Sequence, residues 1–185
     1  ASELNPYADF VMQMDHHVGE LLESLENTGL AEETLVIFTS DNGCSPEANF
    51  KLLKEHGHDP SAGYRGHKAD IYEGGHRVPF ICRWPGVIQP GQTTEALTCL
   101  TDVYATLEEI TGQSKQKVGG EDSFSLKPVF DGEKSTERDT LVSHSIGGSF
   151  AIRKGSWKLC LSAGSGGWSA PVSYTHLRAH ETRPY

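Results

Sequence analysis

Two short segments hold the residue types that could bind a metal ion and an anion. Asp41 and Asn42 follow an apolar run at residues 35–39 and precede a glycine. An apolar run ended by Asp-Asn-Gly predicts a central strand of an α/β sheet, and such sheets bind ligands at the carboxyl ends of their strands. A carboxylate and an amide carbonyl are hard oxygen ligands of the kind that Ca²⁺ or Mg²⁺ takes. The same three residues also form ordinary turns, so this segment alone leaves both interpretations open.

The second segment, residues 64–80, places several cations among glycines. Arg65, His67 and Lys68 are near neighbours in the sequence, and further glycines flank them. Because glycine permits positive φ and close backbone approach, this composition predicts a tightly folded loop. A lysine held on such a loop near a divalent cation could bind and neutralise an oxyanion. The alternative is that Lys68 is a solvated loop charge.

Three blocks of sequence agree with one known family in order, spacing and content. The first is Ser-Asp-Asn-Gly at residues 40–43, and the second is Gly-His-Lys with Tyr-Glu-Gly-Gly within residues 66–75. The third is Arg-Val-Pro-Phe running into Trp-Pro-Gly within residues 77–86. Together they resemble the sulfatase family of the alkaline phosphatase superfamily. The resemblance covers most of residues 7–171 and implies an α/β fold, part of a sandwich of helices around a mixed sheet, with a small antiparallel C-terminal subdomain.

The resemblance implies roles for five residues. Asp41 and Asn42 are similar to two of the family's calcium ligands, and Lys68 is similar to the catalytic lysine that contacts the sulfate. Arg65 and His67 are further candidates for contact with the substrate. The implied metal is Ca²⁺ rather than Mg²⁺, and the implied substrate is a sulfate ester. The breadth of the family suggests a sulfated carbohydrate.

Cys44 is the residue that most invites confusion with the family's nucleophile. Sulfatases make formylglycine from the first residue of a Cys-x-Pro-x-Arg or Ser-x-Pro-x-Arg motif. Pro46 is in the right place here, but Ala48 stands where arginine is required, and the family's motif lies upstream of Asp-Asn-Gly rather than after it. We therefore interpret Cys44 as structural. Formylglycine and the other calcium-binding aspartates are expected upstream, so the parent protein should hydrolyse sulfate esters and this chain alone should be inactive.

The resemblance also divides the chain. Residues 1–138 correspond to the later part of a sulfatase catalytic domain, and residues 139–172 to the start of the C-terminal antiparallel subdomain. Residues 173–185 resemble no sulfatase segment and look like translated vector sequence, which does not belong in an argument about fold.

Local signals predict the elements that position these residues. Asn5 and Pro6 start a helix whose apolar residues recur at helical spacing until a terminal glycine. Residues 50–61 are expected to form a polar loop facing the substrate. Thr101 or Asp102 can cap a second helix that follows, and we interpret Asp102 as a cap rather than a catalytic acid. Short apolar runs between glycine-rich turns predict an antiparallel meander at residues 140–144, 150–153 and 157–161.

Composition narrows the possible partners. The chain has 185 residues, a formal net charge of −9 and a mean hydropathy of −0.44. The acidic balance argues against a nucleic-acid partner, and no apolar run has the length of a membrane span. Four cysteines without metal-type spacing are interpreted as free thiols, with disulfides left open. Family habit implies that the parent protein is periplasmic or secreted; oligomeric state is not predicted.

Two other functions share these residues. Phosphodiesterases and phosphonate hydrolases of the same superfamily use similar metal chemistry, but with a nucleophile that this chain lacks. A calcium-stabilised carbohydrate-binding module would bind sugars without turnover. Lys68 followed by Tyr-Glu-Gly-Gly at residues 72–75 favours a sulfatase over both.

Overall fold

The computed structural model describes residues 2–112 and 119–170 of the chain. It begins with the long helix α1, Pro6–Asn27, as the sequence predicts. Asn5 caps this helix, because its side chain accepts a hydrogen bond of 2.9 Å from the backbone N–H of Ala8. Proline at the first helical position needs no hydrogen-bond partner there. The expected terminal glycine, Gly29, directly follows the C-cap residue Thr28 and has a φ of +71°.

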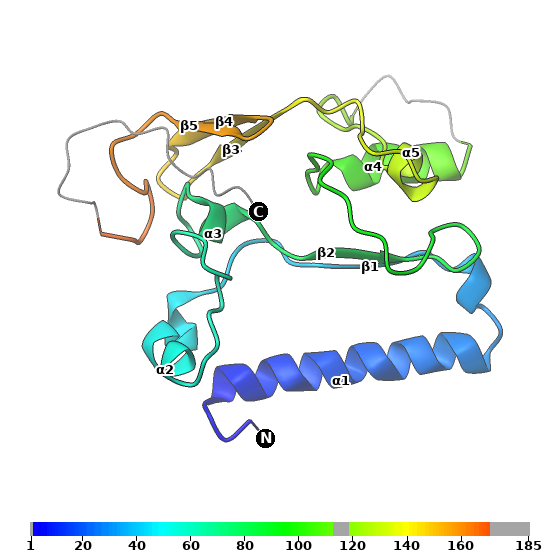
Figure 1. Cartoon of the computed structure of the whole chain (residues 1–185), viewed down its shortest axis with the longest axis horizontal. Coiled ribbons are helices and arrows are strands. Elements are labelled where there is room, and N and C mark those ends of the chain that lie inside the picture. Colours follow the sequence, from blue (N-terminus) through cyan, green and yellow to red (C-terminus); the bar gives the residue numbers. More distant parts are fainter. Residues whose placement is uncertain (1, 113–118, 171–185) are drawn as a thin grey trace.

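A ribbon of two antiparallel strands follows α1. After the short 3₁₀ helix η1, Ala31–Glu33, strand β1, Val36–Thr39, pairs with strand β2, Phe80–Arg83. In Figure 1 α1 runs along one side of this ribbon, and a second helical region lies on the other side. The predicted strand is therefore confirmed. It was expected to be central in a larger sheet, but β2 is its one partner strand among the described residues.

Residues 50–61 differ from the prediction. They were expected to be a polar loop, but the structure forms helix α2, Phe50–Glu55, directly after the 3₁₀ helix η2, Pro46–Ala48. Asn49 starts α2, because its side chain accepts the N–H of Leu52 at 3.2 Å. Leu53 is 2% exposed. One buried leucine and one cap are enough to stabilise a helix too short to show a periodic pattern.

The next helices are α3, Glu73–His76, α4, Asp102–Ile110, and α5, Lys127–Phe130. The N-cap position of α4 is held by Thr101, and Asp102 is the first helical residue, so the interpretation of Asp102 as the cap is wrong. Its side chain is fully buried and accepts hydrogen bonds from Arg138, the shortest at 2.6 Å. A buried carboxylate needs a charged partner, and here that partner lies far away in the sequence.

The last described part is a three-stranded antiparallel sheet. Its strands are β3, Thr140–His144, β4, Phe150–Lys154, and β5, Trp157–Cys160, in the order β3-β4-β5. This confirms the predicted meander. A small buried apolar cluster joins the sheet to the loop before α3; its members are Ile71, Tyr72 and Ala151. The sheet thus packs directly against the segment that carries the candidate anion-binding residues.

No helix in residues 2–112 or 119–170 is both long enough and apolar enough to cross a membrane. The anomalous segment 173–185 lies outside the described residues.

Candidate active site

The Asp-Asn-Gly turn and the Glu-Gly-Gly segment of α3 touch each other through their backbones. The N–H of Gly43 donates to the carbonyl of Gly75 at 3.0 Å. A Cβ at Gly43 would lie 1.7 Å from the carbonyl oxygen of Gly74, so only glycine permits this contact. The fold therefore brings together the two segments in which the sequence placed metal-binding and anion-binding residues.

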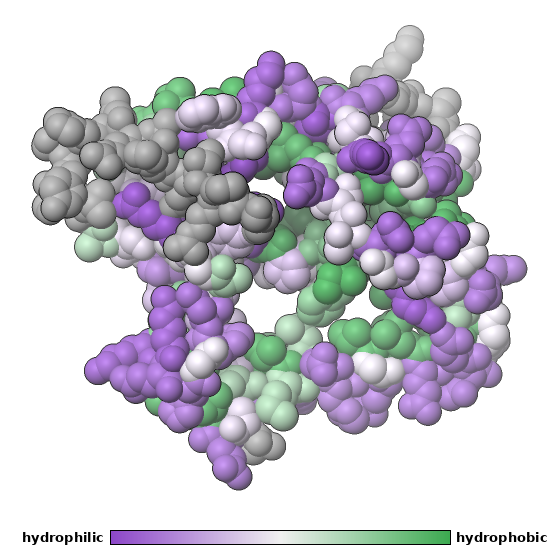
Figure 2. Space-filling view, viewed as in Figure 1, coloured by the Kyte–Doolittle hydropathy of each residue, from purple (hydrophilic) through white to green (hydrophobic). Residues whose placement is uncertain are grey.

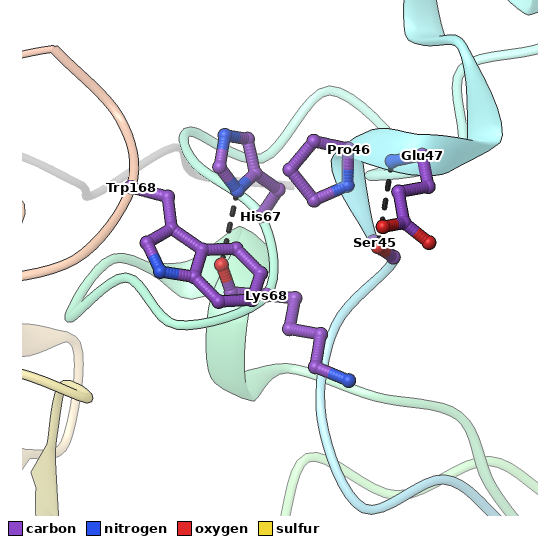
Figure 3. A pocket seen from close by; sticks show the side chains of 6 residues that line it. All are labelled: Ser45, Pro46, Glu47, His67, Lys68 and Trp168. Atoms are coloured by element: carbon purple, nitrogen blue, oxygen red, sulfur yellow. Dashed lines mark hydrogen bonds between the residues drawn. The ribbon is translucent and has the colours of Figure 1, made fainter.

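Lys68 is tied to the same turn by its backbone. Its N–H donates to the carbonyl of Cys44 at 2.9 Å, two residues after Asn42. The side chain is partly exposed and forms no ion pair with any residue that the structure describes. Figure 3 shows the amine pointing away from the rings of His67 and Trp168. The ammonium group is therefore available to an anion.

Asp41 and Asn42 can contribute oxygens to a calcium ion. The Asp41 side chain is exposed, and the Asn42 Nδ2 donates to the carbonyl of Gly43 at 3.1 Å. That bond uses the amide nitrogen and leaves Oδ1 as a potential ligand. Within residues 2–112 and 119–170 no group of three or more His, Cys, Asp or Glu side chains could hold a metal. Because Ca²⁺ takes about six to eight oxygens, the two residues fit one part of a calcium site.

A pocket of about 430 Å³ opens beside Lys68 (Figure 3). Its wall comes from three separate segments: η2 and the residue before it, the lysine loop, and the loop after β5. The lining residues are Ser45, Pro46, Glu47, His67, Lys68 and Trp168. Its volume is within the usual range of small-molecule sites.

His67 and Arg65, the two other candidates for substrate contact, already interact with the protein. His67 Nδ1 lies 3.0 Å from the carbonyl of Lys68, and Nε2 lies 3.2 Å from the hydroxyl of Ser169. Its ring lines the pocket. The Arg65 guanidinium lies 3.8 Å above the Tyr72 ring and outside the described pocket lining. The structure therefore brings His67 to the pocket beside Lys68, and places Arg65 apart from it.

Asp70 was not singled out by the sequence, yet it organises the lysine loop. This buried carboxylate accepts the N–H of His67 and the N–H of Ser169, both at 3.0 Å. Burial acts to raise the pKa of Asp70, but the hydrogen bonds from Ser169 and His67 outweigh it and hold the pKa below its ordinary value. Asp70 remains ionised at neutral pH and fixes the loop next to Lys68.

Glu73 joins the site to the C-terminal sheet. Its buried carboxylate lies 2.8 Å from Nζ of Lys158 and 2.5 Å from Nη2 of Arg153. Burial acts to raise the pKa of Glu73, but Arg153 and Lys158 outweigh it and lower the pKa. A buried carboxylate between two cations is a positional anchor for α3. Its partners lie on β4 and β5, so no short motif could have revealed them.

Cys44 has the environment of a structural cysteine. Its thiol donates a hydrogen bond of 3.1 Å to the Tyr7 hydroxyl of α1. Burial raises the pKa of the Cys44 thiol, and the hydrogen bond with Tyr7 offsets this in part. A raised pKa disfavours the reactive thiolate. All four cysteines are free thiols and half-buried.

Comparison with known proteins identifies the family to which this chain belongs. The family model for sulfatases matches residues 1–113, which is more than half of the chain. The chain belongs to the sulfatase family. An N-acetylgalactosamine-6-O-sulfatase of Bacteroides thetaiotaomicron is 33% identical over 160 residues, covering 85% of this chain. Human arylsulfatase A is 37% identical over 158 residues, covering 83% of this chain.

Comparison with solved structures also finds sulfatases. A solved structure concerned with the metabolism of multiple glycosaminoglycans by Bacteroides thetaiotaomicron superposes with a TM-score of 0.74 and 34% identity. The match covers 82% of this sulfatase chain and 32% of that one. The expected α/β, alkaline-phosphatase-like fold class is therefore confirmed. The chain spans about a third of the relatives' length: 31% of the bacterial sulfatase and 30% of the human enzyme.

Proposed function

We propose that the complete protein hydrolyses sulfate esters of carbohydrates, and that this chain supplies one half of its active site. Asp41 and Asn42 are two of the calcium ligands, and Lys68 binds the sulfate group. The observation that carries the proposal is the backbone link between them. The lysine loop bonds to the end of the Asp-Asn-Gly turn at 2.9 Å, and the Gly-Gly turn bonds to it at 3.0 Å. Metal ligands and anion-binding cation therefore form one preorganised unit.

Each group has a defined task in sulfate transfer. Bound Ca²⁺ would neutralise charge on the sulfate oxygens, and formylglycine from the upstream part would supply the nucleophile. The Lys68 ammonium donates to a sulfate oxygen and stabilises the charge that develops there. Asp70 and Glu73 do not touch the substrate; they hold the loop and α3, so that Lys68 keeps its position.

A carbohydrate is the substrate class that the relatives and the pocket favour. One matched relative is an N-acetylgalactosamine-6-O-sulfatase. The pocket beside Lys68 has room for a sugar ring at about 430 Å³. His67 lines this pocket and is a substrate contact. Arg65 lies outside the pocket lining and contacts only a substrate that extends beyond the pocket.

The proposal extends to the organisation of the parent protein. Residues 1–138 would complete the catalytic domain with the upstream part, and residues 139–172 would begin the C-terminal subdomain. The parent protein would be periplasmic or secreted, where Ca²⁺ is plentiful.

The test is sulfate release by the complete protein. Purified from its natural gene, it should liberate sulfate from sulfated monosaccharides, and peptide mass spectrometry should find formylglycine upstream. The 185-residue chain alone should release none. Faster turnover of phosphodiesters or phosphonates would replace the proposal with the phosphoesterase alternative. Sugar binding without turnover of any ester would favour the binding module.

A further inference from the structure

Trp168 is a large apolar side chain that remains exposed to solvent in the folded chain. It is 53% exposed, although it sits at the pocket beside Lys68. Exposing an indole forgoes much of the stabilisation that its burial would bring. A single exposed aromatic side chain needs no explanation by itself, but one that lines a pocket next to an available cation does.

The residues on both sides of Trp168 are anchored. Gly167 packs so closely on the lysine loop that a Cβ there would lie 2.3 Å from the carbonyl oxygen of Ala69. Ser169 donates its N–H to Asp70 at 3.0 Å, and its hydroxyl also bonds to that carboxylate. The backbone is thus fixed immediately before and after the indole. The loop presents Trp168 in a set position without using it as core.

The same loop is fixed at two further points. The carbonyl of Ser165 accepts the N–H of Ile71 at 2.8 Å, and the carbonyl of Gly166 accepts the N–H of Gly147 at 2.9 Å. Its closest contacts therefore run to the residues just after Lys68 and to the turn after β3. Because Asp70 binds both the lysine loop and Ser169, the indole and the lysine are positioned by one common carboxylate.

We propose that the Trp168 indole is the platform on which the sugar ring of the sulfated substrate packs. This inference rests on the proposed function and specifies how the carbohydrate is held. A pyranose has an apolar C–H face that packs on an aromatic ring, and polar edges that need hydrogen bonds. Across the pocket, Ser45 and Glu47 offer a hydroxyl and a carboxylate for those edges (Figure 3). Lys68 binds the sulfate, so the platform selects the group to which the sulfate is attached.

The platform can be tested in the complete protein with Trp168→Ala and Trp168→Phe. Calorimetry should show that Trp168→Ala weakens binding of a sulfated monosaccharide, such as N-acetylgalactosamine 6-sulfate, by about tenfold or more. Inorganic sulfate has no sugar ring, so its affinity should stay unchanged. Trp168→Phe keeps an aromatic face and should recover most of the sugar affinity. Trp157→Ala removes a tryptophan that is 69% exposed on β5, away from the pocket lining, and should change neither affinity.

The outcomes separate this inference from the proposed hydrolysis. Equal loss of sugar and sulfate binding in Trp168→Ala, or a lower melting temperature with unchanged sugar affinity, would show that Trp168 is structural. If no monosaccharide in a panel of sulfated sugars binds the unsubstituted protein, the platform is also wrong. If sugars bind and Trp168→Ala weakens them selectively while no sulfate is released, the platform stands and only the proposed hydrolysis fails.

Discussion

Lys68 is positioned by its backbone, whereas its charge is left for a ligand. Its N–H bonds to Cys44, and its neighbour His67 is held by Asp70. A lysine whose ammonium group paired with a local carboxylate would already be neutralised and would bind sulfate less well. The buried carboxylate near the site, Glu73, pairs instead with Arg153 and Lys158. Arg153 and Lys158 thus serve the structure, whereas the Lys68 ammonium group stays available to bind an anion.

Asp41 gives a prediction at the residue scale. Asp41→Asn removes one negative charge from the proposed set of calcium ligands, and calcium affinity depends strongly on the charge of its ligands. In the complete protein, after removal of metal with a chelator, the Ca²⁺ concentration that restores half of the activity should rise by about tenfold or more. Asp15→Asn, on the exposed surface of α1, should leave it unchanged. An unchanged calcium requirement in Asp41→Asn would remove Asp41 from the ligand set.

At the scale of elements, the site depends on contacts between three turns and one sheet. The turn after β1 touches α3 itself, and α3 is held by cations from β4 and β5. The loop after β5 then closes the pocket with Trp168. Displacing any one of these elements should therefore disturb the others.

Gly43→Ala tests the closest of these contacts. The new Cβ would lie 1.7 Å from the carbonyl oxygen of Gly74, so the two turns must separate. We expect a loss of about 1–3 kcal/mol in the free energy of unfolding, together with a lower sulfate-releasing activity. Gly19→Ala is the matched control, because nothing lies within 4 Å of its Cβ. In α1 it should stabilise by about 0.5–1 kcal/mol. Equal effects of both changes on melting would contradict the close contact.

Glu73 gives a prediction about pH. Its pKa is lowered in the folded state, so its stabilisation is complete above the ordinary value of 4.5 and is lost as pH falls through the folded pKa. Glu73→Gln leaves Lys158 and Arg153 without their buried partner and should cost about 3–5 kcal/mol at neutral pH. Thermal melting of the variant should also depend less on pH below about 4.5 than that of the unsubstituted protein.

An exposed ion pair provides the control for Glu73. Glu55 lies 3.9 Å from Lys51 on α2, and both side chains are mostly exposed. Glu55→Gln should change the free energy of unfolding by less than about 1 kcal/mol. If Glu73→Gln changed the free energy of unfolding as little as Glu55→Gln does, the ion pairs of Glu73 would not anchor α3.

Local signals in the sequence predicted local structure well. The Asn-Pro start of α1, the strand before Asp-Asn-Gly and the meander at β3–β5 all depend on neighbouring residues, and the structure confirms them. The failures at Asp102, Asp70 and Ser169 have a different cause. Asp102 was interpreted as a cap because Arg138, its buried partner, is distant in the sequence. Asp70 and Ser169 escaped notice for the same reason, since a contact across so many residues leaves no local pattern.

At the scale of the whole molecule, one face of α1 is incompletely covered. A groove of about 400 Å³ lies between α1 and β1, lined by Phe10, Met14, Val18, Leu21 and Ile37 among others. Phe10 is 64% exposed and Leu21 is 53% exposed. Figure 2 shows apolar residues gathered around the opening between α1 and the strands. Because the chain spans 31% of its bacterial relative, we expect the remaining part of the sulfatase domain to cover this groove.

Phe10→Lys should therefore act in opposite directions in two contexts. In the 185-residue chain alone it removes an exposed apolar group and should reduce self-association, measured by light scattering. In the complete protein it would bury a charge and should lower the melting temperature. Met12→Lys is the control, because Met12 is 52% exposed on α1 but lies outside the groove lining. Equal melting temperatures for the two variants of the complete protein would contradict a covered groove.

The most direct test of the active-site assignment is sulfate release by the complete protein with Lys68→Ala. Loss of the ammonium group should lower kcat/KM for a sulfated monosaccharide by about 10²–10³-fold, the size of one transition-state donor. Lys51→Ala, which removes a highly exposed lysine of α2, should leave kcat/KM unchanged. Circular dichroism and the melting temperature should match among all three proteins. A folded Lys68→Ala variant with unchanged kcat/KM would show that Lys68 does not bind the reacting sulfate.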